Sequence, residues 1–165
     1  MKPIAIFYHM RLMGGDPPIN FDHCSNILAE QTFDVNKSGL QKSATFLESG
    51  LNGEGIEAAQ SLVSGNILHH PEGRGEHPTL NRVREFAHAH PGWYLFYHHT
   101  KGAIHTGNEM MAGWRRCMEY HLVWQWRTCM EALDAGAESV GCHYMTPEKY
   151  GAHLVGVPYW GGNFW

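Results

Sequence analysis

The sequence is poor in charged residues. They make up 17% of its 165 residues, and the formal net charge is −4 with the histidines neutral. Proteins that bind nucleic acid by neutralising phosphates rely on lysine and arginine, so we expect no nucleic-acid partner. No stretch approaches the roughly 20 consecutive apolar residues of a membrane-spanning helix. We therefore expect no membrane span.

Cysteines are few and widely spaced. The four of them form no Cys-x-x-Cys pair and show no zinc-site spacing: Cys24, Cys117, Cys129 and Cys142. The chain enters the apolar run at residues 4–8 almost at once, so we expect no secretory signal. Reduced thiols without a signal predict a cytoplasmic protein.

Sequence fingerprints of common nucleotide and metal sites are also missing. No G-x-G-x-x-G follows the first apolar run, and no G-x-x-x-x-G-K-[ST] occurs, which argues against dinucleotide and P-loop enzymes. Thirteen histidines are many for this length, yet no H-E-x-x-H is present. Two histidine pairs are adjacent in sequence, and adjacent residues of a strand point to opposite faces.

What is present is a regular alternation of apolar runs and helical periodicity. The apolar runs predict strands over residues 3–9, 43–51, 66–69, 93–97 and 139–144. Spacings of three and four predict helices over residues 22–37, 55–63, 79–90 and 108–133. This alternation predicts an α/β fold, with one domain spanning residues 1–165 and a Rossmann-type, mostly parallel sheet with helices on both faces. In the strand order 3-2-1-4, the first and fourth strands are neighbours at a topological switch point.

The fourth predicted strand ends abruptly in polar residues. The run from Trp93 continues into His98, His99, Thr100, Lys101 and Gly102, which places them at the carboxyl edge of the sheet. Ligands of open α/β sheets bind at this edge. Lys101 offers a charge for phosphate, and Gly102 allows the backbone to approach a ligand closely. An ordinary exit from a strand into a surface loop explains the same residues.

The longest predicted helix carries an apolar stripe. Six residues at intervals of three or four are expected to be buried: Trp114, Met118, Leu122, Trp126, Cys129 and Leu133. Two ion pairs at spacing i,i+4 are expected on its outer surface, Arg115/Glu119 and Arg127/Glu131. The helix begins after the Lys101-Gly102 loop, so its N-terminus, with Arg115 and Lys101 nearby, is a candidate phosphate site.

Several of these segments resemble a known family. The matching stretches are Phe7-Tyr8-His9, the segment from Gln31 to Leu40, Gly50-Leu51-Asn52-Gly53, the run from Tyr97 to Gly102, the helix from Trp114 to Cys129, and Gly162-Asn163-Phe164-Trp165. Together they resemble glycosyltransferases of bacterial and viral surface-glycan synthesis, along nearly the whole chain. The resemblance implies a GT-A-like fold and a role in polysaccharide biosynthesis. The partners it implies are a nucleotide-sugar donor and a glycan acceptor.

A binding site follows from that resemblance. We expect the donor base beside Tyr8 and His9. The diphosphate is expected near His99, Thr100, Lys101, Gly102 and Arg115. The C-terminal Asn163, Phe164 and Trp165 are expected to bind a sugar, although packing of these rings onto the core is an equal alternative.

The catalytic groups are less well defined. Glu109 and Glu138 flank predicted helix and strand ends and are candidates for the base that activates the acceptor hydroxyl; both also fit solvated surface positions. Many GT-A enzymes hold Mn²⁺ or Mg²⁺ with an Asp-x-Asp motif, and this sequence has none. A metal would therefore need His98, His99 or an isolated carboxylate.

Three other interpretations fit the same residues. Related proteins continue beyond the position that corresponds to Trp165, which favours a nucleotide- or glycan-binding module without turnover. The histidine content favours a metal-binding or metal-dependent hydrolytic protein. A sheet completed by a second subunit would make the chain part of a homo-oligomer.

Overall fold

The computed structural model describes residues 2–12, 20–52, 55–70, 75–100 and 102–142, and the backbone of 144–145 and 159–160. Within these residues, strands and helices alternate along the chain. The bounds are β1 Ile4–Arg11, α1 Phe21–Lys37, α2 Leu40–Ser43, β2 Phe46–Asn52, α3 Ile56–Leu62, β3 Asn66–His70, α4 His77–Ala89, β4 Tyr94–His99, α5 Glu109–Met118, the π-helix η1 Glu119–Trp124, α6 Trp126–Asp134, β5 Tyr144–Met145 and β6 Tyr159–Trp160.

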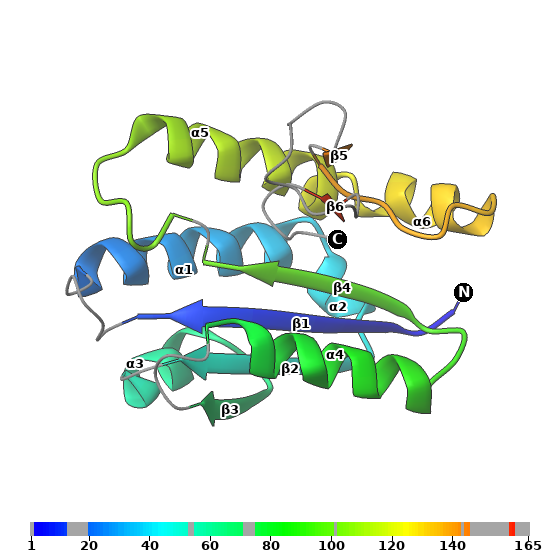
Figure 1. The fold of residues 1–165 in the computed structure, drawn as a ribbon, viewed down its shortest axis with the longest axis horizontal. Helices are drawn as coiled ribbons and strands as arrows, with labels where there is room; N and C mark the ends of the chain where they lie inside the picture. Colours follow the sequence, from blue (N-terminus) through cyan, green and yellow to red (C-terminus); the bar gives the residue numbers. More distant parts are fainter. Residues whose placement is uncertain are drawn as a thin grey trace.

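The four long strands form one parallel sheet. Its strand order is β3-β2-β1-β4, so β1 pairs with β2 on one side and with β4 on the other. The arrowheads of all four strands in Figure 1 point the same way. The predicted α/β class and the predicted adjacency of the first and fourth strands are confirmed. The strand order reverses between β1 and β4, which is the topological switch point of the sheet.

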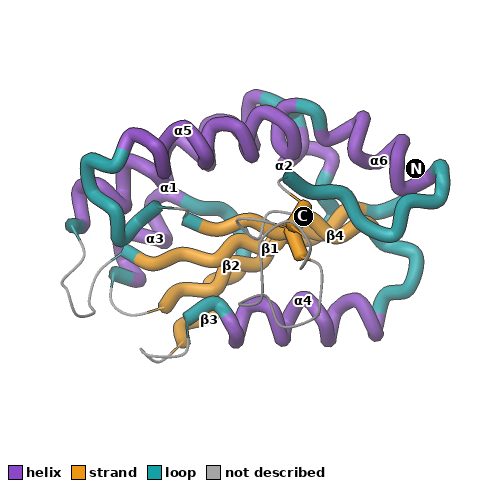
Figure 2. The backbone as a smooth tube through the Cα atoms, turned by 45° about the horizontal axis from the view of Figure 1, so that its top comes forward, coloured by secondary structure: helices purple, strands orange, loops and turns teal. Residues whose placement is uncertain are grey.

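Helices cover both faces of this sheet, as predicted. Figure 2 shows α1, α5 and α6 on one face and α4 on the other. The alternation of side chains along β1 explains both contacts. Ile4 and Ile6 pack with Val35 of α1 and Trp126 of α6. Phe7, the residue after Ile6, faces the other side of β1 and packs against α4, with its ring centroid 5.4 Å from that of Phe86.

The predicted helix over residues 108–133 is interrupted. It divides into α5, η1 and α6, with a turn at Gln125 between the last two. A π-helical segment adds a residue to a turn and changes the direction in which later side chains point. Met118, Leu122 and Trp126 of the predicted stripe are buried, as expected, whereas Trp114, Cys129 and Leu133 are only half-buried.

The prediction that Arg115 and Glu119 form a surface pair is wrong. Their exposed fractions are 5% and 4%. Both residues flank Met118 on the helix face that packs toward α1, and α1 presents Glu30 and Gln31 there. These polar partners allow the two charged residues to be buried.

The predicted strand over residues 139–144 is also wrong. Residues 139–142 are not in a strand, and Tyr144–Met145 pairs antiparallel with Tyr159–Trp160 in a separate two-stranded sheet. Val140 and Cys142 pack with Met118 and Leu122. The apolar run therefore covers the α5–η1 helices instead of extending the parallel sheet. No helix in the described part of the chain has the length and apolar character needed to cross a membrane.

Candidate functional site

A hollow opens at the carboxyl edge of the sheet, at the switch point. Its volume is about 290 Å³. Its lining includes residues from the ends of β1 and β4, from the residue before α4, and from the loop after β4: His9, Arg11, Glu76, His99, Thr100 and Gly102. Three of the predicted strand-exit residues, His99, Thr100 and Gly102, therefore lie together with the predicted His9.

On the α4 face of the sheet, His9 contacts the helix directly. His9 Nδ1 lies 2.8 Å from Thr79 Oγ1, within hydrogen-bond distance. Burial lowers the pKa of His9 to about 4, more than the nearby Glu76 carboxylate raises it. His9 is therefore neutral at physiological pH.

A carboxylate joins the same face. Glu76 Oε2 accepts a hydrogen bond from the Tyr97 hydroxyl at 2.6 Å and lies 2.9 Å from His99 Nδ1. Glu76 is the N-cap residue of α4, and its side chain makes no capping hydrogen bond to that helix. Its carboxylate is directed to β4 instead.

Thr100 ties the ends of β1 and β4 together. Its amide donates to the His9 carbonyl at 3.0 Å, and its hydroxyl accepts from the Arg11 amide at 3.2 Å. Gly102 follows with φ of +86°, a left-handed conformation that favours glycine. Its carbonyl oxygen lies 3.2 Å from His23 Nε2 of α1. The loop after β4 is therefore held by contacts from both β1 and α1.

Tyr8 and His98 lie on the opposite face of the sheet from His9 and His99. Their rings stack with centroids 4.0 Å apart, and the Tyr8 hydroxyl donates to Gln31 Oε1 in α1. Burial lowers the pKa of His98 to about 3. A ligand in the hollow therefore cannot contact both Tyr8 and His9. Because His98 and His99 point to opposite faces of the sheet, these two histidines cannot bind one metal ion together.

Arg115 lies behind the loop. Its Nη2 is 3.3 Å from Glu30 Oε2, and its Nε is 3.8 Å from Glu119 Oε1. Burial raises the pKa of Glu119 to about 7, although Gln31 and Arg115 lower it in part. A Cβ on Gly102 would lie 3.5 Å from Arg115 Nη1. Arg115 therefore supports the loop from within the core and is not part of the hollow's lining.

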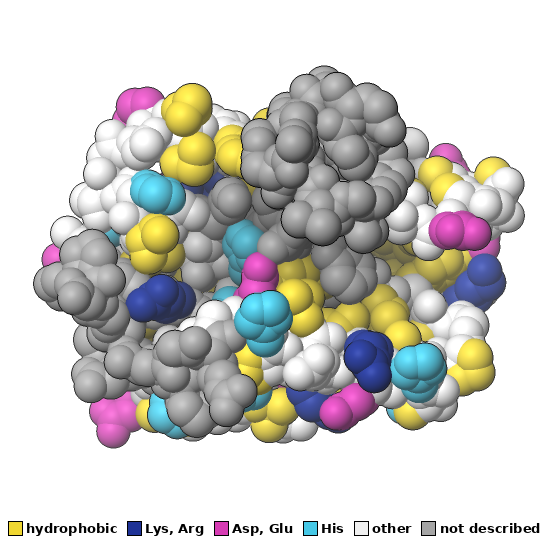
Figure 3. All heavy atoms as spheres, viewed as in Figure 1, with side chains coloured by type: hydrophobic (Ala, Val, Ile, Leu, Met, Phe, Trp, Pro, Cys, Tyr) yellow, Lys and Arg dark blue, Asp and Glu magenta, His cyan; other side chains and the backbone are white. Residues whose placement is uncertain are grey.

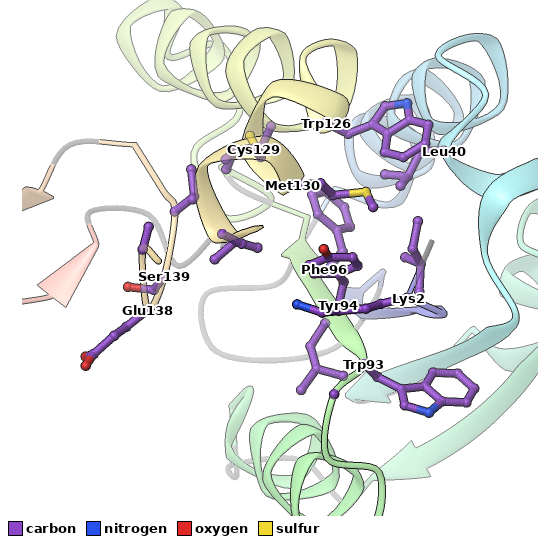
Figure 4. A pocket seen from close by; sticks show the side chains of 17 residues that line it. Lys2, Leu40, Trp93, Tyr94, Phe96, Trp126, Cys129, Met130, Glu138 and Ser139 are labelled. Atoms are coloured by element: carbon purple, nitrogen blue, oxygen red, sulfur yellow. The ribbon is translucent and has the colours of Figure 1, made fainter. Parts of the chain in front are cut away.

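The two carboxylates predicted as candidate bases are not brought together. Glu109 is the exposed first residue of α5. Glu138 lies beside a different, apolar cavity of about 410 Å³ between β4 and α6. Figure 3 shows apolar side chains in this depression, and in Figure 4 the Glu138 carboxylate points away from Trp93 and Phe96. Neither glutamate lines the hollow. The predicted Lys101, Asn163, Phe164 and Trp165 lie outside the described residues.

Sequence reasoning missed Arg11 and Glu76. Arg11 lies two residues after His9, so strand periodicity puts both side chains on one face of β1. Glu76 precedes Pro78, and proline is common in the first turn of a helix. In parallel α/β units the helix begins at the carboxyl edge of the sheet. Pro78 therefore marks the start of α4 in the sequence and indicates that Glu76 lies at this edge.

Comparisons with protein-family models, curated proteins and solved structures gave no match for this chain. The described residues contain no group of three histidine, cysteine or acidic side chains placed to hold a metal ion. Mg²⁺ and Mn²⁺ prefer several oxygen ligands. Glu76 is the one carboxylate among the described residues lining the hollow, and it already binds Tyr97 and His99. Among the described residues, the lining of the hollow therefore offers a divalent metal ion a single carboxylate ligand.

Close packing beneath the hollow leads to a first prediction. A Cβ on Gly50 of β2 would lie 1.9 Å from Thr79 Oγ1 and 3.0 Å from His70 Nε2. We expect Gly50→Ala to cost about 2–3 kcal/mol through overpacking, and to displace Thr79 from His9. Urea unfolding measures this cost. Gly113→Ala is the control, because a Cβ there meets no described atom within 4 Å; equal stability of both variants would contradict the packing described.

Proposed function

We propose that the chain binds a nucleotide sugar at the carboxyl edge of the sheet and transfers its sugar to a glycan acceptor, within a GT-A-like fold. The observation that carries the proposal is the hollow at the switch point between β1 and β4. Nucleotides commonly bind at this position in open α/β sheets. The family resemblance of Phe7-Tyr8-His9 and His98 to Gly102 supports the same position from the sequence.

The hollow supplies a cation for the donor diphosphate. Arg11 lines it, and a guanidinium can donate two parallel hydrogen bonds to phosphate oxygens. The backbone of Arg11 is held on both sides. Arg11 pairs with Asn52 of β2, and its amide donates a hydrogen bond to the Thr100 hydroxyl. We propose that Arg11, with Lys101, which follows Thr100 in the sequence, neutralises the leaving nucleoside diphosphate. No step is assigned to a metal ion.

Ligand binding tests the proposal. Calorimetry and thermal shift with UDP-, GDP-, dTDP- and CMP-sugars, each with Mn²⁺ and with EDTA, are expected to show saturable binding of one nucleotide class. Donor binding without sugar release identifies a binding module. Binding of metal without any nucleotide would contradict the proposal and support the metal-binding interpretation.

The role of Arg11 has its own test. Arg11→Gln removes a charge-assisted hydrogen bond worth about 1.5–3 kcal/mol, so we expect the Kd of the nucleoside diphosphate to rise roughly 10- to 100-fold. The Kd of the nucleoside alone is expected to stay unchanged. Lys101→Ala is expected to show the same selectivity. Arg84→Gln on the exposed side of α4 is the control; equal losses for nucleoside and diphosphate would remove the phosphate role.

A further inference from the structure

Tyr97, Glu76 and His99 form a continuous hydrogen-bonded group, of which Glu76 and His99 line the hollow and Tyr97 is buried behind them. The Tyr97 hydroxyl and His99 Nδ1 approach the same carboxylate oxygen, Glu76 Oε2, at 2.6 and 2.9 Å. Tyr97 and His99 are alternate residues of β4, so both side chains face α4. The carboxylate comes from the opposite element, at the start of that helix.

The Glu76 carboxylate is the shared hydrogen-bond acceptor of this group. Burial, followed by the charge of Glu76, raises the pKa of Tyr97 well above its ordinary value, so the phenol keeps its proton and donates it. An ionised Glu76 carboxylate can only accept hydrogen bonds. The hydrogen bond at 2.9 Å therefore requires a proton on His99 Nδ1. In the neutral ring, the proton on Nδ1 leaves Nε2 as the basic nitrogen.

Partial exposure and a carboxylate partner together separate His99 from the other two histidines that line the hollow, His9 and His105. His105 is exposed, but among the described residues no carboxylate lies within hydrogen-bond distance of it. The His99 side chain is 14% exposed and that of Glu76 is 25% exposed, and both line the hollow with Arg11. His9 is bound to Thr79, and His98 is buried on the other face. His99 is therefore the imidazole that combines an orienting carboxylate with access to a molecule in the hollow.

We propose that His99 is the catalytic base that activates the acceptor hydroxyl, with Glu76 and Tyr97 as positioning residues. This inference rests on the proposed glycosyl transfer. The acceptor hydroxyl gives its proton to His99 Nε2 as its oxygen forms a bond to the anomeric carbon of the donor. The bond from that carbon to the diphosphate oxygen breaks, and its electron pair leaves with the nucleoside diphosphate. The imidazolium, stabilised by Glu76, then releases its proton to solvent.

Kinetics separates this inference from the proposed function. We expect His99→Gln to lower kcat for transfer about 10²–10⁴-fold, with the donor Kd unchanged within about threefold. Glu76→Ala is expected to lower kcat at least tenfold and Tyr97→Phe less, and the conservative Glu76→Gln is expected to recover part of the loss. His88→Gln, exposed on α4, is the control. Loss of the acidic limb of the pH–rate profile in His99→Gln would mark proton transfer.

Each outcome decides one proposal. Transfer by the wild type together with an unchanged kcat in His99→Gln overturns the base and leaves the proposed function standing. Absence of donor binding and transfer in the wild type overturns both. A readout independent of activity is the imidazole ¹⁵N spectrum, in which we expect His99 protonated on Nδ1 in the neutral ring. A wild-type ring protonated on Nε2 overturns the assignment of the base.

Discussion

Replacement of Arg115 by methionine is expected to destabilise the protein by about 1 kcal/mol more at pH 8 than at pH 5, because it leaves a buried carboxylate without its cation and that carboxyl must then take up a proton. Glu119 is 4% exposed, and burial already raises its pKa to about 7 with Arg115 in place. Without the guanidinium, ionisation of Glu119 becomes more costly. At pH 5 the carboxyl is protonated, so the loss is expected to be smaller there.

The measurement is urea unfolding of the wild type and variants at pH 5 and pH 8. Arg115→Met combined with Glu119→Gln is expected to recover most of the stability at pH 8, since no charge then remains to be buried. Arg116→Met, on the neighbouring position of α5 and exposed, controls for the loss of a positive charge. A loss of equal size at both pH values, or no recovery in the double variant, would contradict this account of Glu119.

Acid is expected to destabilise the protein through two buried histidines. Burial lowers the pKa of His9 to about 4 and that of His98 to about 3, from 6.5 in the unfolded chain. The unfolded chain therefore binds more protons between these values, and stability is lost as the pH falls below 6.5. Between pH 6.5 and 5 the two residues together are expected to cost about 3 kcal/mol.

Glu119 acts in the opposite direction. Its raised pKa means that the folded state binds a proton more tightly, so its contribution to stability improves as the pH falls through 7. Glu119→Gln is therefore expected to expose the full acid sensitivity, and His98→Phe in that background to remove about half of it. His98→Phe keeps a ring to stack on Tyr8, and His88→Gln controls for a lost surface histidine. An unchanged dependence on pH in His98→Phe would show that His98 titrates normally.

Strand periodicity made the sheet predictable from the sequence. The apolar runs before His9 and before His98 are short and end in polar residues, so the parallel strands and the position of their carboxyl edge followed from local patterns. The neighbourhood of β1 and β4 followed only for the strand order 3-2-1-4, which the alternation of strands and helices does not by itself determine. The break at Glu119–Trp124 did not follow from local patterns, because its apolar stripe continues at helical spacing through the π-helical segment.

The side-chain partnerships of the site were harder to predict. Glu76 meets His99 only because α4 crosses back over the sheet, and no local pattern encodes which β4 residue the first turn of α4 meets. Arg115 and Glu119 have the spacing of a surface ion pair. Their burial depends on polar groups of α1 some 85 positions away in the chain. Partners from distant segments decide burial, so periodicity alone gave the wrong face.

Because β1 is paired on both sides, the two walls of the hollow are expected to differ in stability as the temperature rises. Arg11 stands on a strand hydrogen-bonded along both edges, whereas Glu76 stands at the first turn of a helix that packs on the sheet from outside. Segments of proteins open separately, and helices at the periphery open more readily than central strands. Detachment of α4 would withdraw the carboxylate from His99 and leave the guanidinium in place. Anion affinity would then outlast proton transfer as the temperature rises.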